Sequence, residues 1–286
     1  MGDCLAGYLE DRPKVGGRKS LAYFATMLPE HIDKQTCHGY AALRADAGIR
    51  PKTVHTEMAL LRSALIWAER EKWVEKAPFI FMPDAGEPRD RWLSADEAAR
   101  LREGCAGAHV RLFVDLALNT AARPGAILDL TWDRVSFDLG RIDFNPPGRA
   151  RTRKGRSVVP MTPGAREALE RAYEARTTPY VIEWAGEKVA SVKKGFARAC
   201  ERAGIHGVTP HTLRHTAATW MAESGVPMRQ ISLYLGHSST DVTERVYAKH
   251  SPDYLKDAAD ALTQFPLVQM NQNRETKGEM SSRKRK

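Results

Sequence analysis

The chain has 286 residues, of which 42% are hydrophobic and 28% charged, as in ordinary soluble globular proteins. Its length allows about two domains and a substantial buried core. The net charge of +9 favours a polyanionic partner, either nucleic acid or an anionic surface, while no stretch approaches the roughly 18 to 20 apolar residues of a membrane span.

The cysteines and the N-terminus indicate a cytoplasmic protein. The four cysteines are scattered without a C-x-x-C pair, so neither a zinc knuckle nor a disulfide framework is predicted. Reduced thiols are the expected state. The opening "MGDCLAGYLEDRPK" lacks the apolar core of a signal peptide.

Residues 1–83 are predicted to form an all-helical domain. Its clearest helix is "TVHTEMALLRSALIWAEREKW", because one face carries the apolar stripe Val54, Met58, Leu61, Leu65 and Ala68. Shorter helices are predicted at "SLAYFATML" and at "TCHGYAALRADAG", where Gly48 ends the helix.

A linker at residues 84–91 is predicted to separate this domain from a second one at 92–265. The stretch "FMPDAGEPRDRW" carries two prolines, a glycine and mixed charges. Beyond it, "SADEAARLREGC" begins a helix with Ser94 as N-cap and Glu97 at the capping-box position. The apolar helix "HVRLFVDLALNTA" follows, and Pro124 is expected to open the next helix.

The middle of the second domain changes to short extended runs. "RIDF" and "SVVPM" are predicted to form a hairpin around the basic turn "NPPGRARTRKGR". Helices are predicted at 163–176 and 187–203, with a strand at "YVIEW" between them. The expected fold class is therefore mainly α with a small antiparallel β-sheet.

Three further helices are predicted near the C-terminus. Thr209 and Pro210 begin "VTPHTLRHTAATWMAESG", and Gly225 ends it. "PMRQISLYL" stops at Gly236, which places His237 just past a helix end. In "TDVTERVYAKH", Asp241 and Glu244 are assigned to capping positions and Tyr247 to the third turn. Residues 266–286 are predicted to be a disordered basic tail.

His211 and His215 are spaced like the two histidines of an H-E-x-x-H zinc site. Thr212 stands where that pattern needs its glutamate, and Arg214 would repel a dication. A zinc hydrolase is therefore a weak alternative, and we expect no metal and no other cofactor.

The order of motifs carries a more specific signal than any single residue. "AARPGAILDLTWDRV", a basic hairpin ending in "VVP", "HTLRHTAAT", "LGHSS" and a tyrosine ten residues later follow one another. This succession resembles the tyrosine recombinase (phage integrase) family over about 92 to 262. Residues 1–83 are similar to the helical core DNA-binding domain of that family. The resemblance implies metal- and ATP-independent DNA strand exchange by Arg123, Lys154, His211, Arg214, His237 and Tyr247.

The chemistry of these residue types agrees with that assignment. Two arginines offer planar forks to the non-bridging oxygens of a phosphate. A tyrosine hydroxyl, with a pKa near 10 in water, needs a proton acceptor to attack at neutral pH. His211 is assigned to take or guide that proton and His237 to hydrogen-bond the phosphate. Lys154 is assigned to protonate the leaving 5′ oxygen. His215 is assigned to packing or to support of the site.

Two positions depart from the family pattern. The family often has an acidic residue three positions after its first arginine, where this chain has Ala126. The family lysine commonly lies near the start of the hairpin turn, which here is occupied by Arg151 and Arg153, so Lys154 is shifted by a residue or two.

We therefore expect a site-specific DNA recombinase, a prophage or mobile-element integrase associated with the nucleoid. The resemblance implies a C-shaped clamp on double-stranded DNA and a homotetramer on two synapsed sites, with an accessory excision or DNA-bending protein as a further partner. "SPDYLKDAADAL" is expected to form a helix that either docks on a neighbouring subunit or closes its own domain. A separate N-terminal arm-binding domain is expected to be absent. The alternatives are a type IB topoisomerase-like enzyme and a catalytically inactive DNA-binding regulator.

Overall fold

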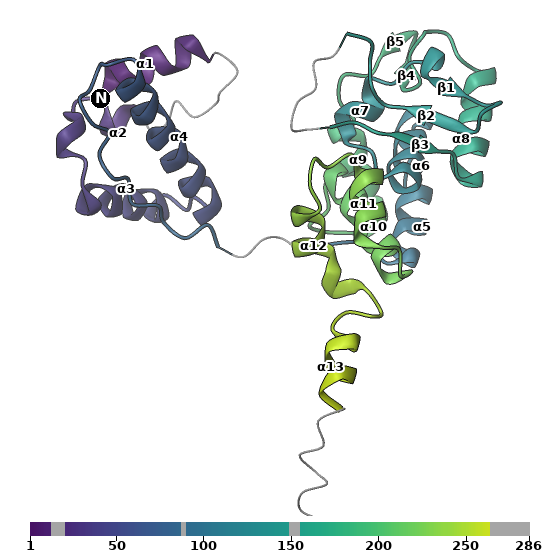
Figure 1. The fold of residues 1–286 in the computed structure, drawn as a ribbon. Coiled ribbons are helices and arrows are strands. Elements are labelled where there is room, and N and C mark those ends of the chain that lie inside the picture. The colour runs from purple at the N-terminus through teal and green to yellow at the C-terminus, as the bar shows by residue number, and fades with distance from the viewer. Residues whose placement is uncertain (13–20, 87–89, 149–154, 264–286) are drawn as a thin grey trace, which may run out of the picture. The chain divides into compact units, whose positions relative to one another are not determined.

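The computed structural model of the chain describes residues 1–12, 21–86, 90–148 and 155–263. Two compact units, Met1–Arg89 and Asp90–Lys286, make up the chain (Figure 1). Within the described residues, helices predominate and the strands form small antiparallel sheets, which confirms the predicted fold class. None of the helices in these ranges has the length and apolar character to cross a membrane.

Unit 1 is a helical bundle with its own apolar core. Its elements are α1 (Gly2–Asp11), α2 (Leu21–Phe24), η1 (Pro29–His31), α3 (Lys34–Asp46) and α4 (Pro51–Arg70). The predicted stripe of α4 is buried along its whole length, and α1 packs against this helix. The helix predicted at "SLAYFATML" is shorter than expected, because the chain turns after Phe24.

Unit 2 is built around α6, which packs against α10 and α8. Phe113 and Leu116 of α6 are fully buried in this core. The helical elements of the unit are α5 (Ala95–Glu103), α6 (Ala108–Thr120), α7 (Pro124–Leu128), η2 (Trp132–Arg134), α8 (Pro163–Glu174), α9 (Lys193–Arg202), α10 (Pro210–Glu223), α11 (Met228–Leu235), α12 (Asp241–Tyr247), η3 (Ala248–His250) and α13 (Lys256–Thr263).

A three-stranded antiparallel sheet covers part of this core. Its strands, in spatial order, are β1 (Val135–Ser136), β2 (Arg141–Asp143) and β3 (Val158–Pro160). Ile142 pairs with Val159, and both are buried, whereas the neighbouring Val158 is exposed. The two predicted hairpin strands thus pair, and most of the basic turn between them, residues 149–154, lies outside the described residues.

The segment predicted as a helix from residue 187 is helical only from Lys193. Residues Glu183–Trp184 (β4) and Glu187–Lys188 (β5) form a second hairpin instead. Ala185 and Gly186 both have positive φ angles, of 53° and 78°, which is the backbone of a two-residue hairpin turn. This turn reverses the chain, so the helix α9 begins at Lys193 and not at residue 187.

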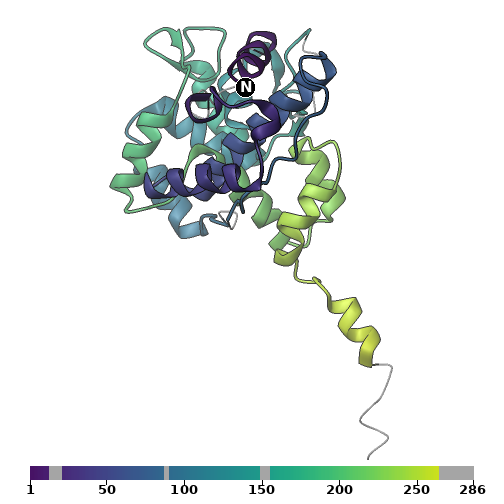
Figure 2. The ribbon, with the colours of Figure 1, turned by 90° about the vertical axis from the view of Figure 1, so that its left-hand side faces the viewer.

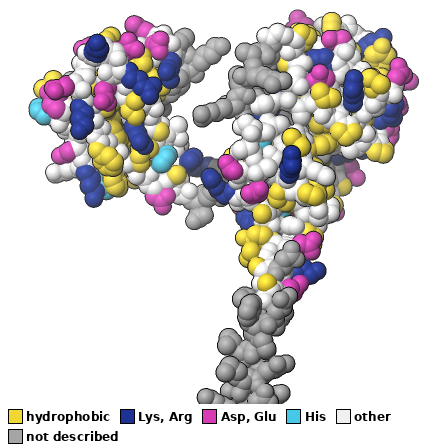
Figure 3. Space-filling view, viewed as in Figure 1, with side chains coloured by type: hydrophobic (Ala, Val, Ile, Leu, Met, Phe, Trp, Pro, Cys, Tyr) yellow, Lys and Arg dark blue, Asp and Glu magenta, His cyan; other side chains and the backbone are white. Residues whose placement is uncertain are grey.

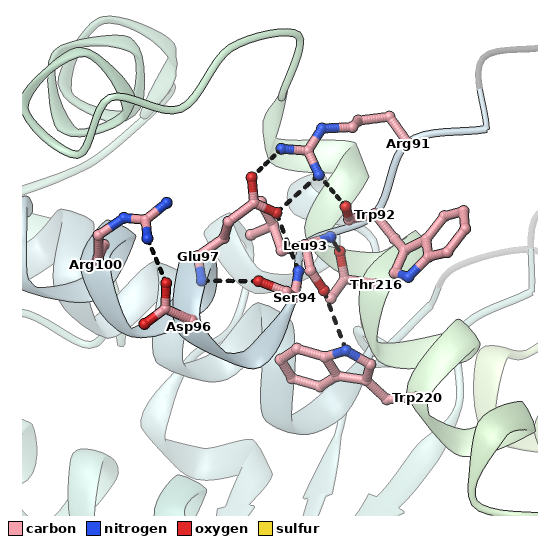
Figure 4. Close-up of polar contacts among 9 residues, drawn as sticks. All are labelled: Arg91, Trp92, Leu93, Ser94, Asp96, Glu97, Arg100, Thr216 and Trp220. Carbon is pink, nitrogen blue, oxygen red and sulfur yellow. Dashed lines mark hydrogen bonds and ion pairs between the residues drawn. The ribbon is translucent and has the colours of Figure 1, made fainter.

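The start of unit 2 is fixed to α10 (Figure 4). Ser94 and Glu97 form the predicted capping box, and Arg91 pairs with Glu97. The Leu93 backbone N–H donates to Thr216 Oγ1 at 3.0 Å, and Trp220 Nε1 donates to the Leu93 carbonyl at 3.1 Å. Side chains of α10 therefore satisfy both the N–H and the C=O of Leu93, which fixes the position of the segment before α5.

The helices α10, α11 and α12 lie side by side in the green part of the ribbon (Figures 1 and 2). Thr209 caps α10 and Pro210 is its first residue, as predicted. Gly236 ends α11 in the left-handed conformation with φ of 65°, which is accessible to glycine at little cost.

The prediction for α12 was wrong in two details. Its N-cap is Thr240 rather than Asp241, and no side chain caps it. Tyr247 is the last residue of a seven-residue helix, not a residue of a third turn, because the chain tightens into the 3-10 turn η3 directly after it.

Candidate active site

Arg214 lies in the middle of α10 with only 5% of its surface exposed. Its Nη1 donates to the carbonyl of Ala121 and its Nη2 to the carbonyl of Leu235, each at 2.8 Å. These carbonyls belong to the C-terminal ends of α6 and α11, where the helix dipole favours a cation. Burial lowers the pKa of Arg214 to about 10, and the charge of Arg123 adds to this effect. The guanidinium therefore remains cationic at neutral pH.

Arg123 is half-buried and directly precedes α7. Its Nη1 donates to the carbonyl of Gly155 at the end of the hairpin turn. Arg123, Arg156 and Arg214 line one small pocket, with Ala126 in its wall. Ala126 supplies no carboxylate, so a backbone carbonyl holds Arg123 in place. A pocket lined by guanidinium groups suits an anion with several acceptor oxygens.

His237 directly follows the Gly236 turn and bonds through both ring nitrogens. Its Nε2 lies 2.9 Å from Nη2 of Arg214, and its Nδ1 lies 2.8 Å from Oγ1 of Thr243. Arginine can only donate, so Nε2 accepts and the proton of the neutral ring is on Nδ1, which donates to Thr243. Burial, then the charges of Arg214 and Arg123, lower the pKa of His237 to about 4. The ring is therefore neutral at pH 7.

Tyr247 is buried at the end of α12, with 7% of its surface exposed. Its hydroxyl lies 3.1 Å from Nδ1 of His215, and the two rings are tilted with centroids 5.2 Å apart. Burial raises the pKa of Tyr247, and the charge of Arg214 opposes this. The hydroxyl is thus protonated in the resting site.

His211 lies on the first turn of α10 and is exposed. Partial desolvation by its surroundings lowers its pKa, and the nearby charges of Arg214 and Arg123 act in the same direction. His211 lies three residues before Arg214 on α10, so the two side chains share a face of this helix. The hydrogen-bond partner of the Tyr247 hydroxyl is His215 rather than His211.

Lys154 lies outside the described residues, so its predicted place in the site stays a prediction. The next residue, Gly155, contacts Arg123 and packs tightly on the α11 turn: a Cβ added to it would lie 2.6 Å from the Gly236 carbonyl oxygen. Ser157 Oγ donates to the carbonyl of Tyr234 at 2.7 Å. The returning hairpin chain is therefore fixed next to the arginine pocket.

The two histidines considered for zinc have other surroundings. In the described part of the chain, no group of three or more His, Cys, Asp or Glu side chains could hold a metal ion. His215 bonds instead to Tyr247 and, through Nε2 at 3.3 Å, to Oδ1 of Asp90. Of the two histidines, His215 is therefore the one that contacts the tyrosine.

Sequence reasoning missed two residues of this site. Asp90 precedes His215 by 125 positions and lies in a charged stretch typical of a linker, so no local pattern indicates their contact. Gly155 reads as an ordinary turn residue in "RKGRS". Only the approach of two chain segments shows that a side chain there has no room.

Comparison with known proteins places this site in a family. The model of the phage integrase family matches residues 91–253. The integrase of Salmonella phage P22 is 27% identical over 241 residues, with 78% of this chain and 62% of that protein covered. The chain therefore spans less than two thirds of the length of that relative.

Solved structures share the fold. The Tn1549 transposon integrase in complex with transposon right end DNA superimposes with a TM-score of 0.74 at 19% identity, covering 92% of this chain and 99% of that one. A lambda integrase tetramer bound to a Holliday junction gives 0.67 at 18% identity, covering 87% and 77%. The family model matches more than half of this chain, so the chain belongs to the phage integrase family, as the order of its motifs indicated.

Proposed function

We propose that the protein is a site-specific DNA recombinase of the prophage or mobile-element integrase type, which cuts and rejoins strands through a 3′-phosphotyrosine. The observation that carries this proposal is the arrangement around Arg214. Its guanidinium contacts His237 and shares a pocket with Arg123, and Ala121, whose carbonyl it bonds, lies in the same buried cluster as Tyr247. An anion pocket next to a buried tyrosine is what attack on a phosphodiester requires.

In this proposal Arg123 and Arg214 bind the non-bridging oxygens of the scissile phosphate. Each can donate two parallel hydrogen bonds, which suits the charge of a pentacoordinate transition state. His237 is neutral and already bonded to Arg214, so it fixes the guanidinium and can turn toward the phosphate. His211, on the same face of α10 as Arg214, is assigned to the phosphate or to the tyrosine proton.

Strand cleavage exchanges one ester for another. The oxygen of Tyr247 bonds to phosphorus, the bond to the 5′ oxygen breaks, and Lys154 protonates the leaving oxygen. A second DNA end bearing a 5′ hydroxyl can reverse the step without ATP, because the phosphoester has not been lost to water. No cofactor is needed for this exchange.

Double-stranded DNA is the proposed substrate, and unit 1 is proposed to be the core-binding domain that holds it together with unit 2. The excess of basic residues favours a polyanionic partner. In the sequence, residues 149–154 carry four cationic side chains, just before the pocket residue Arg156. The matched Tn1549 integrase is described in complex with DNA, which supports this choice.

A homotetramer on two synapsed sites is the proposed active assembly. The matched lambda integrase forms a tetramer on a Holliday junction. At the start of the C-terminal segment, Tyr254 and Leu255 are 50% and 63% exposed, which favours docking of this segment on a neighbouring subunit. An accessory excision or DNA-bending protein remains part of the proposal.

The DNA that flanks the gene supplies the test. Its two junctions, cloned on plasmids, are incubated with the purified protein, and the products are sequenced. We expect exchange between the junctions, with Tyr247→Phe inactive. Relaxation of supercoils without exchange would indicate a topoisomerase-like enzyme, and DNA binding without cleavage would indicate an inactive regulator; either would contradict the proposal.

A further inference from the structure

His215 links the proposed nucleophile to a carboxylate. Its Nδ1 lies 3.1 Å from the Tyr247 hydroxyl and its Nε2 lies 3.3 Å from Oδ1 of Asp90. The other oxygen of Asp90 pairs with Lys249. The three linked groups come from the segment before α5, from α10 and from α12, so tertiary folding assembles a chain from carboxylate through imidazole to phenol.

The donors and acceptors of this chain allow one arrangement in the neutral state. A carboxylate can only accept, so Nε2 of His215 carries the ring proton and donates it to Asp90. Nδ1 is then left as an acceptor, aimed at the hydroxyl of Tyr247. Burial lowers the pKa of His215, against the opposing effect of Asp90, so the ring is neutral at pH 7 and can receive a proton.

The surroundings hold this geometry. Trp92 presents its ring edge-on to His215, at 6.4 Å between centroids, and to His250, at 4.8 Å. Leu93 is fixed to α10 by its two backbone hydrogen bonds (Figure 4). Asp90 is therefore positioned by a segment that is anchored three residues further along the chain.

We propose that His215 is the catalytic residue that accepts the proton of Tyr247 during strand cleavage, and that Asp90 is the positioning residue that fixes the tautomer of His215. This inference rests on the proposed function, in which Tyr247 is the nucleophile. It leaves His211, on the same face of α10 as Arg214, to bind the phosphate.

The step balances without any further reactant. The O–H bond of Tyr247 breaks and its proton moves to Nδ1 of His215, while the oxygen forms a bond to phosphorus. The bond between phosphorus and the 5′ oxygen breaks, and that oxygen takes a proton from the acid of the site. The resulting imidazolium is paired with Asp90, and rejoining returns the proton to the tyrosine oxygen. As the bond to phosphorus forms, the phenol becomes a much stronger acid, so a neutral histidine suffices as acceptor.

A nicked duplex that carries the junction sequence traps the covalent adduct and gives a single-turnover rate on a denaturing gel. The key variant is His215→Asn, because asparagine places a polar atom near the position of Nδ1 and can still bond the Tyr247 hydroxyl but cannot take its proton. We expect adduct formation to fall by about 10² or more, with DNA binding and melting temperature unchanged. Tyr234→Phe, altered at a partly buried ring of α11, should stay near the parent rate.

Chemical rescue separates proton transfer from packing. Imidazole added to His215→Ala should restore adduct formation, and substituted imidazoles of higher pKa should restore it more. A structural histidine would show no such dependence on base strength. Failure of every imidazole to restore His215→Ala, together with a parent-like rate for His215→Asn, would overturn the proposal.

The pH dependence tests the role of Asp90. The charged and titratable groups that face His215 are Asp90, Tyr247, His250, Lys249 and His211, and of these Asp90 raises the pKa of the His215 ring whereas His250 and Lys249 lower it. Adduct formation should lose rate as the pH falls through the pKa of His215. Asp90→Asn removes the group that raises this pKa, so the loss should move to lower pH and the plateau rate should be lower. An unchanged profile would contradict the positioning role.

The outcomes also separate this inference from the proposed function. A covalent adduct that persists in Tyr247→Phe would overturn the assignment of the nucleophile and thus the proposed function. If Tyr247→Phe is inactive while His215→Asn is fully active and His211→Ala is not, the function stands and His211 is the proton acceptor.

Discussion

Arg214 and His237 are polar groups that the fold can bury because each finds partners for its nitrogens. Arg214 satisfies the carbonyls of two helix ends, and His237 accepts from Arg214 while donating to Thr243. Donors fixed before the substrate arrives cost no reorganisation when charge develops on the phosphate, which is the main electrostatic advantage of an enzyme site. Both residues were predicted from the sequence, because the order of the motifs that contain them resembles the phage integrase family, although neither residue alone indicates a site. Their partners were not predicted, since backbone carbonyls leave no trace in side-chain patterns.

The variant Lys154→Ala tests the assignment of the general acid. If Lys154 protonates the leaving oxygen, its removal should slow cleavage by about 10² or more, because an alkoxide is a poor leaving group. A substrate with sulfur in place of the bridging 5′ oxygen releases a thiolate that needs no proton. The variant should therefore cleave the sulfur substrate nearly as fast as the parent protein, measured as adduct formation.

Arg123→Ala is the matched control for this comparison. Its proposed role is to stabilise non-bridging oxygens, which the sulfur substitution leaves unchanged, so sulfur should not rescue it. If Lys154→Ala stays slow on the sulfur substrate, or is scarcely slowed on the normal one, the acid is another residue, and Arg153 and Arg151 are the next to test.

The segment that leads into β3 lies at the arginine pocket, which Arg156 and Ser157 help to line. Gly155 touches the backbone of Gly236, at the turn between α11 and His237, and its carbonyl accepts from Arg123. The hairpin strands were predicted from their alternation and the α11 end from its glycine. The contact between them was not, because it depends on two backbones approaching with no side chain between them. Similarly, the strand predicted at "YVIEW" contains β4, but β5 was predicted as helix, because a two-residue turn gives little sequence signal.

Gly155→Ala should therefore disturb activity more than folding. The added Cβ would lie 2.6 Å from the Gly236 carbonyl oxygen, so the hairpin or the α11 turn must move. Because a displacement of about 1 Å can cost roughly 10² in rate, we expect adduct formation to fall by at least 10-fold. Gly125→Ala is the control, since its Cβ meets nothing within 4 Å and its φ is not positive. Equal rates for the two variants would show that the Gly155 contact does not position the site.

At the scale of the whole molecule, the proposal requires two compact units to act on one polyanion. In the view of Figure 3, basic side chains are interspersed with acidic ones on both units, so the excess charge of +9 is not gathered into one visible patch there. Phosphate contacts are then expected to be distributed, as in proteins that embrace a duplex. The sequence predicted the helical content of each unit from its periodicity.

DNA binding by the full chain should weaken steeply with salt and be insensitive to chelators. Lysine and arginine contacts release counterions from the duplex, so the logarithm of the affinity should fall linearly with the logarithm of salt concentration. Fluorescence anisotropy with a labelled duplex, at several salt concentrations and with or without EDTA, measures both effects. An affinity that is unchanged between low and moderate salt would exclude the proposed clamp, and a loss on chelation would indicate a metal in the interface.

The central claim is that Tyr247 attacks a DNA phosphate, and identification of the covalently attached residue tests it most directly. The protein is trapped on a nicked junction duplex, digested with protease and nuclease, and the nucleotide-bearing peptide is sequenced by mass spectrometry. We predict a 3′-phosphotyrosine at Tyr247, and no adduct in Tyr247→Phe, which should still bind DNA because only the nucleophilic oxygen is removed. Tyr234→Phe, altered at the partly buried tyrosine of α11, should still form the adduct. A nucleotide attached to any other residue, or an adduct in Tyr247→Phe, would contradict the account.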